Sequence, residues 1–273
     1  MLSAKFFQKK ETAMIIDSHT HIGHKIIVAS PDDLVSSMNA AGIETSLVFA
    51  GHINACSTQL LLEEIAPHRD KLMPVGVISP IWPSEDTLPK LEAMLLQKTL
   101  VAVKFYLGYE HFFPTDHVVR PYLELLAQHG VPAIFHTGDC YGKVGGAKLK
   151  YAHPLHLDEL AVDMPKLTIV MAHMGNPWLT DGAEVCYKNP NVYADCSGFV
   201  CDDFTPSSRE SFIASVRQFM KYTEQPEKLL FGTDWPITNQ RPYADAVTEA
   251  LGGEGGATEL VMGGNAARVF KLA

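Results

Sequence analysis

The stretch MIIDSHTHIG, residues 14–23, is an apolar run that ends in two histidines separated by one small residue. In a β-strand, residues two apart point to the same side, so His19 and His21 are expected to project together, with Asp17 one step behind. One interpretation is that such a pair is half of a metal site, because imidazole nitrogens are common ligands of Zn²⁺. The pair could equally be a polar strand end that hydrogen-bonds to its neighbours, and the rest of the chain has to decide.

The chain has the size and composition of one large α/β domain. Its 273 residues are 47% apolar and 19% charged, which suffices for a single core and argues against disorder. The formal net charge of −9 speaks against a nucleic-acid partner, which would need a basic face. No window reaches the apolar length of a membrane span, and residues 1–13 lack a signal-peptide pattern. We therefore expect an N-terminal extension, 1–13, followed by one domain, 14–273.

The five cysteines include no CxxC pair. An odd number without a secretory signal does not fit a disulfide framework, so a reducing cytoplasm is the expected location. For the oligomeric state, a homodimer is the default expectation for a protein of this kind.

Eight short apolar runs follow one another along the chain. They are dense in Val, Ile, Leu and Phe rather than alternating with polar residues, which is typical of strands buried on both faces of a parallel sheet. The runs are 14–21, 45–51, 72–79, 100–107, 131–138, 167–175, 192–198 and 229–236.

Segments with helical spacing of apolar residues lie between these runs. The first is bounded by Ser30, a candidate N-cap followed by proline, and by Gly42 at its end. Asn265 is expected near the cap of the last helix, and the glycine-rich segment 251–257 is expected to be a loop before it. The predicted helices are 30–42, 57–68, 84–98, 115–130, 153–165, 179–189, 207–222, 241–251 and 264–272.

Strand followed by helix, eight times over, predicts a closed (β/α)8 TIM barrel that forms a single domain. An open, doubly wound sheet is the alternative. The chain contains neither a GxGxxG motif nor a Walker loop, so the usual nucleotide signatures of open sheets are missing.

Chemically active side chains stand at the ends of five of the predicted strands. In a parallel barrel these ends meet at one rim, where barrel active sites lie. Taken singly, each has a structural alternative: a hydrogen-bonded strand end, an ion pair between Lys104 and Asp17, or a turn cap at Asp234. Together they predict a metal site, because a divalent cation accepts imidazole lone pairs and neutralises a carboxylate. The six side chains are His19, His21, Lys104, His136, His173 and Asp234.

This ordered set resembles the amidohydrolase superfamily, in particular its amidohydrolase-related branch. The resemblance covers residues 14–271. It consists of HTH after the first strand, lysine on the fourth, histidine on the fifth, AHMG on the sixth, GTDWP on the eighth and the closing NAARVF. It implies a metal-dependent TIM-barrel enzyme, because the branch includes metal-dependent hydrolases and the aminocarboxymuconate-semialdehyde decarboxylase group.

The resemblance also implies roles for the metal-binding residues. His19, His21 and Asp234 would hold one Zn²⁺, and His136 would be a further ligand. His173 would either bind a second metal or act as a base or electrophile near the substrate. Mn²⁺, Ni²⁺ and Fe²⁺ are alternatives to Zn²⁺, since imidazole and carboxylate serve them all.

Lys104 separates two versions of this site. In two-metal members of the superfamily, the resemblance implies a carbamate on this lysine that bridges the two ions. In one-metal members, Lys104 would instead contact a substrate carboxylate. We expect the two-metal form, because every position that it requires is filled.

The implied reaction is hydrolysis of an amide, a lactone or a related carbonyl compound. A bound metal lowers the pKa of water from about 15.7 toward about 7, and Asp234 would take up the proton and pass it to the leaving group. The same ligands could instead anchor an aromatic or muconate-like acid while it loses CO₂, so the ligands do not choose between a hydrolase and a lyase. A scaffold barrel without catalysis is a third alternative, which has no need to retain all six groups.

Residues just beyond the strand ends are expected to contact a small, anionic substrate. The glycine-rich loop 138–154 could be a lid with a positive lining, or a solvated surface loop. Its lysines are Lys143, Lys148 and Lys150, and the candidate substrate contacts are Tyr106, Trp235 and Arg241.

Overall fold

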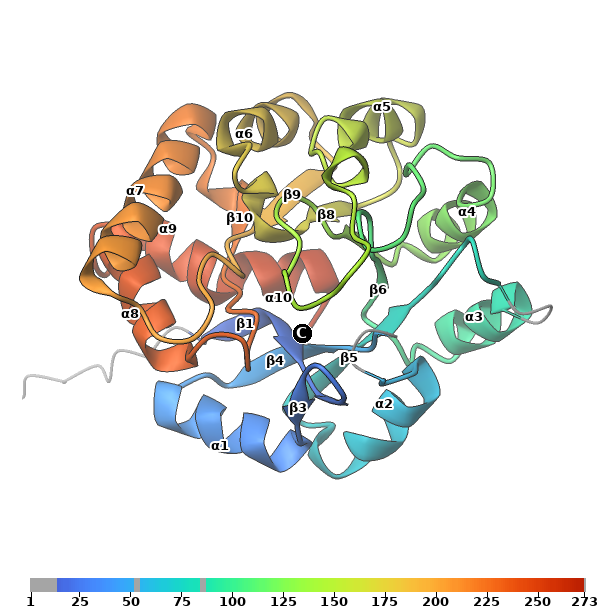
Figure 1. Cartoon of the computed structure of the whole chain (residues 1–273), viewed down its shortest axis with the longest axis horizontal. Coiled ribbons are helices and arrows are strands. Elements are labelled where there is room, and N and C mark those ends of the chain that lie inside the picture. Colours follow the sequence, from blue (N-terminus) through green and yellow to red (C-terminus); the bar gives the residue numbers. More distant parts are fainter. Residues whose placement is uncertain (1–13, 52–54, 84–86, 273) are drawn as a thin grey trace, which may run out of the picture.

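Eight parallel strands form one sheet in the computed structural model, which describes residues 14–51, 55–83 and 87–272 (Figure 1). The order of the strands in the sheet follows their order in the sequence. This confirms the predicted TIM barrel, whereas the predicted extension, 1–13, lies outside the described residues. The strands are β1 (Ile16–His21), β4 (Thr45–Phe49), β5 (Leu72–Val77), β6 (Ala102–Phe105), β7 (Ala133–Phe135), β8 (Ile169–Met171), β9 (Val192–Asp195) and β10 (Leu229–Leu230).

Backbone hydrogen bonds join the first strand to the segment that begins with the last one. The N–H of Ser18 donates to the carbonyl of Phe231 at 2.9 Å, and the N–H of Asp234 donates to the carbonyl of His19 at 2.8 Å. The sheet is therefore closed, and the open-sheet alternative is wrong. Closure also brings the two ends of the chemically active set side by side, although they are more than 200 residues apart in the sequence.

Helices surround the sheet, as Figure 1 shows, because their apolar faces cover the outer side of the strands. The predicted ends of the first helix are confirmed: Ser30 forms a capping box with Asp33, and Gly42 has a φ of 74° at the C-cap. The helices of the ring are α1 (Pro31–Ala41), α2 (Thr58–Glu64), α3 (Thr87–Leu96), α4 (Arg120–His129), α5 (His156–Asp163), α6 (Leu179–Lys188), α7 (Pro206–Thr223) and α8 (Gln240–Ala250).

The C-terminal region differs from the prediction of a loop and one helix. It runs through α9 (Gly256–Glu259), a π-helical turn (Leu260–Gly264) and α10 (Asn265–Phe270). Asn265 is not a cap, because the residues before it are already helical. It is fully buried, and its Nδ2 donates to the carbonyls of Pro226 and Leu229 at 2.8 and 2.7 Å. This asparagine thus fixes the start of β10 against the C-terminal helix.

Side chains inside the barrel follow the period-two rule of strands. Ala102 on β6 and Ile134 on β7 belong to the interior core, where Phe270 of α10 also packs. Two residues further along each strand come Lys104 and His136, both buried. On these two strands, an apolar residue therefore fills the interior below the polar group at the carboxyl end.

Two local elements escaped the sequence prediction. A short antiparallel ribbon, β2 (Gly23–His24) and β3 (Val28–Ala29), follows β1 directly. Its strands are too short for any periodicity to show. In the predicted helix 115–130, the helix begins only at Arg120, and Asp116 instead forms a turn by accepting the N–H of Phe113 at 2.8 Å.

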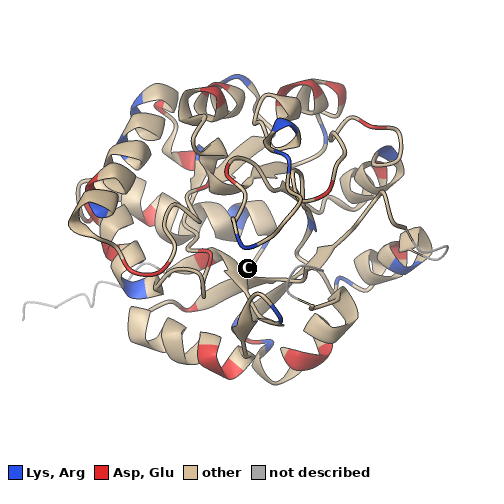
Figure 2. Cartoon of the chain, in the orientation of Figure 1, with Lys and Arg blue, Asp and Glu red and all other residues tan. Residues whose placement is uncertain are grey.

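Charged residues of both signs are interspersed over the outer helices (Figure 2). Each of the five cysteines, all of which the structure describes, is unpaired. Within the described ranges, no helix combines the length and the apolar character needed to cross a bilayer.

Candidate metal centre

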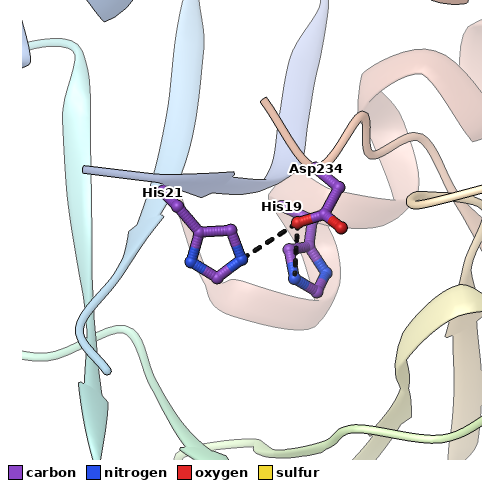
Figure 3. A group of neighbouring side chains, drawn as sticks. All are labelled: His19, His21 and Asp234. Carbon is purple, nitrogen blue, oxygen red and sulfur yellow. Dashed lines mark ion pairs between the residues drawn. The ribbon is translucent and has the colours of Figure 1, made fainter. Parts of the chain in front are cut away.

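His19, His21 and Asp234 converge at the mouth of the barrel (Figure 3). Asp234 Oδ1 lies 3.0 Å from His21 Nε2 and 3.8 Å from His19 Nε2. One ligand atom from each residue lies within 4.8 Å of the other two, and all three residues are buried. Two imidazole nitrogens and one carboxylate oxygen in this arrangement fit the donor set of a divalent ion such as Zn²⁺ or Mn²⁺.

The protonation states suit metal binding, which requires neutral imidazoles and an ionised carboxylate. Burial lowers the pKa of His19 to about 3, and the nearby Lys104 ammonium adds to this effect. Burial by itself would raise the pKa of Asp234, but the hydrogen bond from His21 and the neighbouring imidazoles hold that pKa well below its usual range. The carboxylate is therefore charged in the interior, where a cation would compensate it.

Asp17 holds the two halves of this group together. It does not point into the mouth as simple alternation predicted, because the β1–β4 register shifts between Asp17 and Thr20. Its Oδ2 accepts hydrogen bonds from Thr233 Oγ1 at 2.6 Å and Gln240 Nε2 at 2.8 Å. Asp17 therefore anchors the segment that carries Asp234, and its suggested pairing with Lys104 is wrong.

His136 and His173 complete a group of four imidazoles. The ring centroids of His19 and His173 are 4.9 Å apart, as are those of His136 and His173. Burial lowers the pKa of both His136 and His173, so both rings are neutral. His136 Nε2 donates to the carbonyl of Asp139 at 3.0 Å, which leaves its Nδ1 as the nitrogen with a lone pair.

Two of these residues have a left-handed backbone. His173 has a φ of 65° and Asp234 a φ of 69°, a conformation that costs a non-glycine residue about 1–2 kcal/mol. Such strain persists only where the surroundings determine the conformation, and it is concentrated at functional sites.

Lys104 is the unusual group of the centre. Its side chain is 1% exposed, and its Nζ has no hydrogen-bond partner among the described residues. The ammonium lies over the rings of Phe49 and Tyr106, at 5.0 and 5.4 Å from their centroids. Burial lowers the pKa of Lys104 to about 8, against the opposing effect of Asp195 and Asp234.

All six residues predicted as ligands line one cavity of about 130 Å³. The structure thus brings the predicted set together, while the role of each member stays a prediction. A larger cavity of about 580 Å³ lies between α2 and α3, but its wall is mostly apolar and has no convergent histidines or carboxylates among the described residues.

Of the three predicted substrate contacts, only Tyr106 lines the cavity. The hydroxyl of Tyr106 donates to the carbonyl of Ala50 at 3.0 Å. Trp235 is buried beside β1 and is not among the lining residues. Arg241 lies on the outside of α8, mostly exposed, and its Nε is 3.1 Å from Asp245 Oδ1. The expectation that Arg241 points into the site is wrong, because a residue on the first turn of a surface helix pairs with its i+4 neighbour instead.

The loop 138–154 covers the cavity, but not with its lysines. Asp139, Tyr141, Gly142 and Val144 of this loop line the cavity, whereas Lys143, Lys148 and Lys150 do not. The predicted positive lining is therefore wrong, because the loop residues that line the cavity are one acidic, one aromatic and two apolar residues. Tyr109 Oη accepts the N–H of Tyr141 at 2.6 Å, which ties the loop to the rim.

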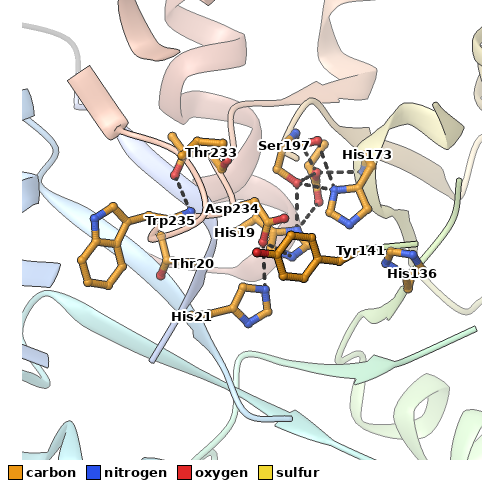
Figure 4. A network of polar contacts seen from close by, with 12 residues as sticks. His19, Thr20, His21, His136, Tyr141, His173, Ser197, Thr233, Asp234 and Trp235 are labelled. Carbon is orange, nitrogen blue, oxygen red and sulfur yellow. Dashed lines mark hydrogen bonds and ion pairs between the residues drawn. The ribbon is translucent and has the colours of Figure 1, made fainter. Parts of the chain in front are cut away.

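Sequence reasoning missed Asp195 and Ser197, at the end of β9. Asp195 Oδ2 lies 2.9 Å from His19 Nδ1, and Ser197 Oγ lies 2.9 Å from His173 Nδ1 (Figure 4). The signal was present, since DCSG (195–198) ends the seventh apolar run as HTH ends the first.

A closed (β/α)8 barrel with two histidines and an aspartate at the carboxyl ends of its strands defines the class of metal-binding TIM-barrel enzymes. The model of the amidohydrolase family matches residues 16–272, and the chain belongs to that family. The family is one of enzymes, and the solved structures that share this fold include a probable hydrolase and decarboxylases. No curated protein matches the sequence.

Solved structures with the same fold cover nearly the whole chain. An uncharacterized TIM-barrel protein from Bordetella bronchiseptica is 20% identical, with a TM-score of 0.74, and the match covers 94% of this chain and 98% of that one. A probable 2-pyrone-4,6-dicarboxylic acid hydrolase from Acinetobacter baumannii with bound citric acid is 17% identical, with a TM-score of 0.69 and coverages of 94% and 99%. A dihydroxybenzoic acid decarboxylase from a Polaromonas species, with manganese and 2-nitroresorcinol bound, is 16% identical, with a TM-score of 0.70 and coverages of 96% and 98%. At these identities the likeness establishes the fold.

Proposed function

We propose that this chain is a metal-dependent hydrolase that acts on a small carbonyl compound bearing a carboxylate. The observation that carries the proposal is the meeting, in one cavity, of a metal-binding group and an ammonium that has no hydrogen-bond partner among the described residues. His19, His21 and Asp234 offer the ligand atoms, and Lys104 offers the positive charge. A buried charge without a partner is costly, so its place in the cavity is best explained by an anion that arrives with the substrate.

Each residue of the site has a different proposed role in the reaction. A divalent ion held there supplies Lewis acidity, which polarises a carbonyl oxygen and acidifies water. Asp234 uses Oδ1 toward His21, and its second carboxylate oxygen is the atom that would take up a proton and return it to the leaving group. His173 lines the cavity next to His19 and would accept a proton from the reacting oxygen.

For Lys104 we propose the ammonium form and therefore one metal ion. The ring faces of Phe49 and Tyr106 attract a cation and repel an anion, so the surroundings favour an ammonium over a carbamate. In this form Lys104 would bind the substrate carboxylate. The carbamylated two-metal form remains the alternative that metal analysis separates.

A decarboxylase is the second candidate, and the wall of the cavity favours it. Three tyrosines, Tyr106, Tyr109 and Tyr141, line the cavity together with apolar side chains, and such a wall suits a planar aromatic acid. The Polaromonas structure, which has this fold, is a decarboxylase of such an acid. The metal-binding residues serve both reactions.

The first experiment is metal analysis of the protein purified without chelators. We expect about one equivalent of zinc or manganese, lost in the D234N variant. About two equivalents, with an added mass of CO₂ on Lys104, would overturn the ammonium form. A fully folded protein that binds neither metal would overturn the proposed function.

The second experiment separates the two reactions. The metal-loaded protein is incubated with lactones and amides of small carboxylic acids and, separately, with hydroxybenzoic acids. Ring opening, acid release and CO₂ release are recorded. We expect hydrolysis, with activity on carboxylated substrates lost in K104M and kept in K166M, which changes an exposed lysine. Release of CO₂ without hydrolysis would instead make the chain a lyase.

A further inference from the structure

Asp195 at the end of β9 has both oxygens fully engaged, although it does not line the cavity. Its Oδ2 accepts from His19 Nδ1 at 2.9 Å. Its Oδ1 accepts the backbone N–H of His173 at 3.0 Å and that of Ser197 at 3.1 Å, and the Ser197 hydroxyl donates to it as well. His19, His173 and Asp195 also satisfy the distances of a metal-binding triplet, so the triplet could be either a second ion site or a support for the first.

The hydrogen bonds of Asp195 favour the second possibility, in which Asp195 supports the ion site that contains His19. A carboxylate can only accept, so the proton of the neutral His19 ring has to sit on Nδ1, facing Asp195. The lone pair then sits on Nε2, the atom that faces Asp234 at 3.8 Å. An ion between Asp195 and His19 would need the nitrogen that the hydrogen bond occupies.

His173 shows the same proton arrangement by a different contact. Its Nδ1 lies 3.1 Å from the carbonyl oxygen of Ser197, which also can only accept, so Nδ1 carries the proton. Asp195 Oδ1 accepts the backbone N–H groups of His173 and Ser197. These two hydrogen bonds hold the left-handed His173 next to the Ser197 carbonyl. Figure 4 shows His19, Ser197 and His173 joined in this network.

We propose that Asp195 is a positioning residue that fixes the Nδ1–H tautomer of His19 and thereby directs its Nε2 lone pair toward the metal. It acts through His19 and touches neither metal nor substrate. The proposal holds for hydrolysis and decarboxylation alike, because it concerns how a ligand is presented. Carboxylates that orient a ligating histidine in this way commonly account for 10- to 100-fold in metal affinity.

The D195N variant tests the proposal sharply, because it separates the carboxylate from the shape of the side chain. The amide oxygen can keep the two backbone N–H bonds of His173 and Ser197, whereas the NH₂ group faces His19 Nδ1. Two donors that face each other repel, so we expect the proton of His19 to move to Nε2, even though Ser197 Oγ also lies 3.1 Å from Nδ1. The tautomer of His173, which is set by the Ser197 carbonyl, stays unchanged and serves as an internal control.

The measurement is nitrogen-15 NMR of the histidine side chains in metal-free protein, with signals assigned through single histidine variants. In the wild type, we expect both His19 and His173 to carry the proton on Nδ1. In D195N, we expect only His19 to change, and zinc to bind 10- to 100-fold more weakly in competition with a chelator. The control is D158N, because Asp158 lies on α5 and pairs with Lys188 of α6 at the surface. This variant should leave both the tautomers and the zinc affinity unaltered.

Two results would overturn the proposal. One is a wild-type His19 with its proton on Nε2, which decides the matter even if D195N fails to fold. The other is a folded D195N whose zinc affinity stays within twofold of the wild type. If the chain does not bind metal, zinc binding is absent in the wild type too. That outcome contradicts the proposed function, whereas the tautomer of His19 can still be measured in the metal-free protein.

Discussion

A lysine ammonium in a protein interior loses its hydration, and Lys104 has no hydrogen bond from the described residues to replace it. Burial lowers the pKa of Lys104 to about 8 from an ordinary value of 10.5. The folded state therefore holds its proton less tightly than the unfolded state does. A residue that costs stability in this way fits a group whose use is to bind an anion, and the surrounding rings of Phe49 and Tyr106 only partly compensate it.

The K104M variant should be more stable than the wild type at pH 7, by up to about 3 kcal/mol, because each pKa unit corresponds to about 1.4 kcal/mol. Between pH 8 and 10.5 the unfolded state binds more protons, so wild-type stability should rise with pH in that window. The variant should not show this rise. Urea unfolding of metal-free protein at several pH values measures both. A destabilised K104M in the metal-free protein would contradict this account, because it would show that the buried ammonium contributes to stability.

At the scale of elements, short loops after the strands fix the site, and the loop after β9 shows how. Gly198 has a φ of 71°, and a Cβ at this position would lie 2.6 Å from His173 Nδ1 and 3.0 Å from Asp234 Oδ2. The absence of a side chain therefore lets the loop approach two site residues at once. Asp195 at the end of β9 and Ser197 in this loop then reach the histidines.

G198A should lose both stability and metal affinity, because the new Cβ pushes against His173 and Asp234. Its matched control is G42A at the end of α1, where φ is 74° and nothing lies within 4 Å of the new Cβ. Both variants should lose about 1 kcal/mol through the left-handed backbone. Zinc titration should find weaker binding only in G198A. Equal zinc affinity in the two variants would show that the loop does not shape the metal centre.

At the scale of the whole molecule, the barrel is closed where the site is built. Asp17 on β1 accepts hydrogen bonds from Thr233 and Gln240 beyond β10. The contacts that close the sheet therefore also place Asp234 beside His19. Burial raises the pKa of Asp17 to about 6 in spite of these hydrogen bonds. Between pH 3.8 and 6 the folded state binds more protons at this group, so its contribution to stability falls as the pH rises through that range.

T233V removes the hydroxyl that donates to Asp17 at 2.6 Å and should destabilise the protein by about 2–3 kcal/mol, the usual worth of a hydrogen bond to a charged group. T223V, at a buried threonine whose hydroxyl bonds within α7, should cost only about 1 kcal/mol. Urea unfolding at pH 7.5 compares the two. Equal losses would show that the seam between β1 and the segment after β10 is not a special point of the barrel.

The alternation of apolar runs and helical segments predicted the barrel, because the inner core needs eight buried strands and each needs a helix to cover it. Lys104 and His136 were predicted at the rim because they stand at strand ends, and the structure agrees with the period-two rule, since each follows an interior residue by two positions. The period-two rule failed for Asp17, where a register shift breaks the alternation. Arg241 was misplaced because distance from a strand end along the chain does not tell which way a helix residue points.

By itself, the sequence determined the fold class and the six groups at the mouth, since both depend on local periodicity and on where strands end. Only the tertiary structure decided which partner each group has. It placed Asp195 behind His19, left Lys104 without a hydrogen-bond partner among the described residues and kept the lysines of loop 138–154 out of the cavity lining. The reason is physical: hydrogen bonds and burial depend on distances between segments far apart in the chain, and those distances exist only after the sheet has closed.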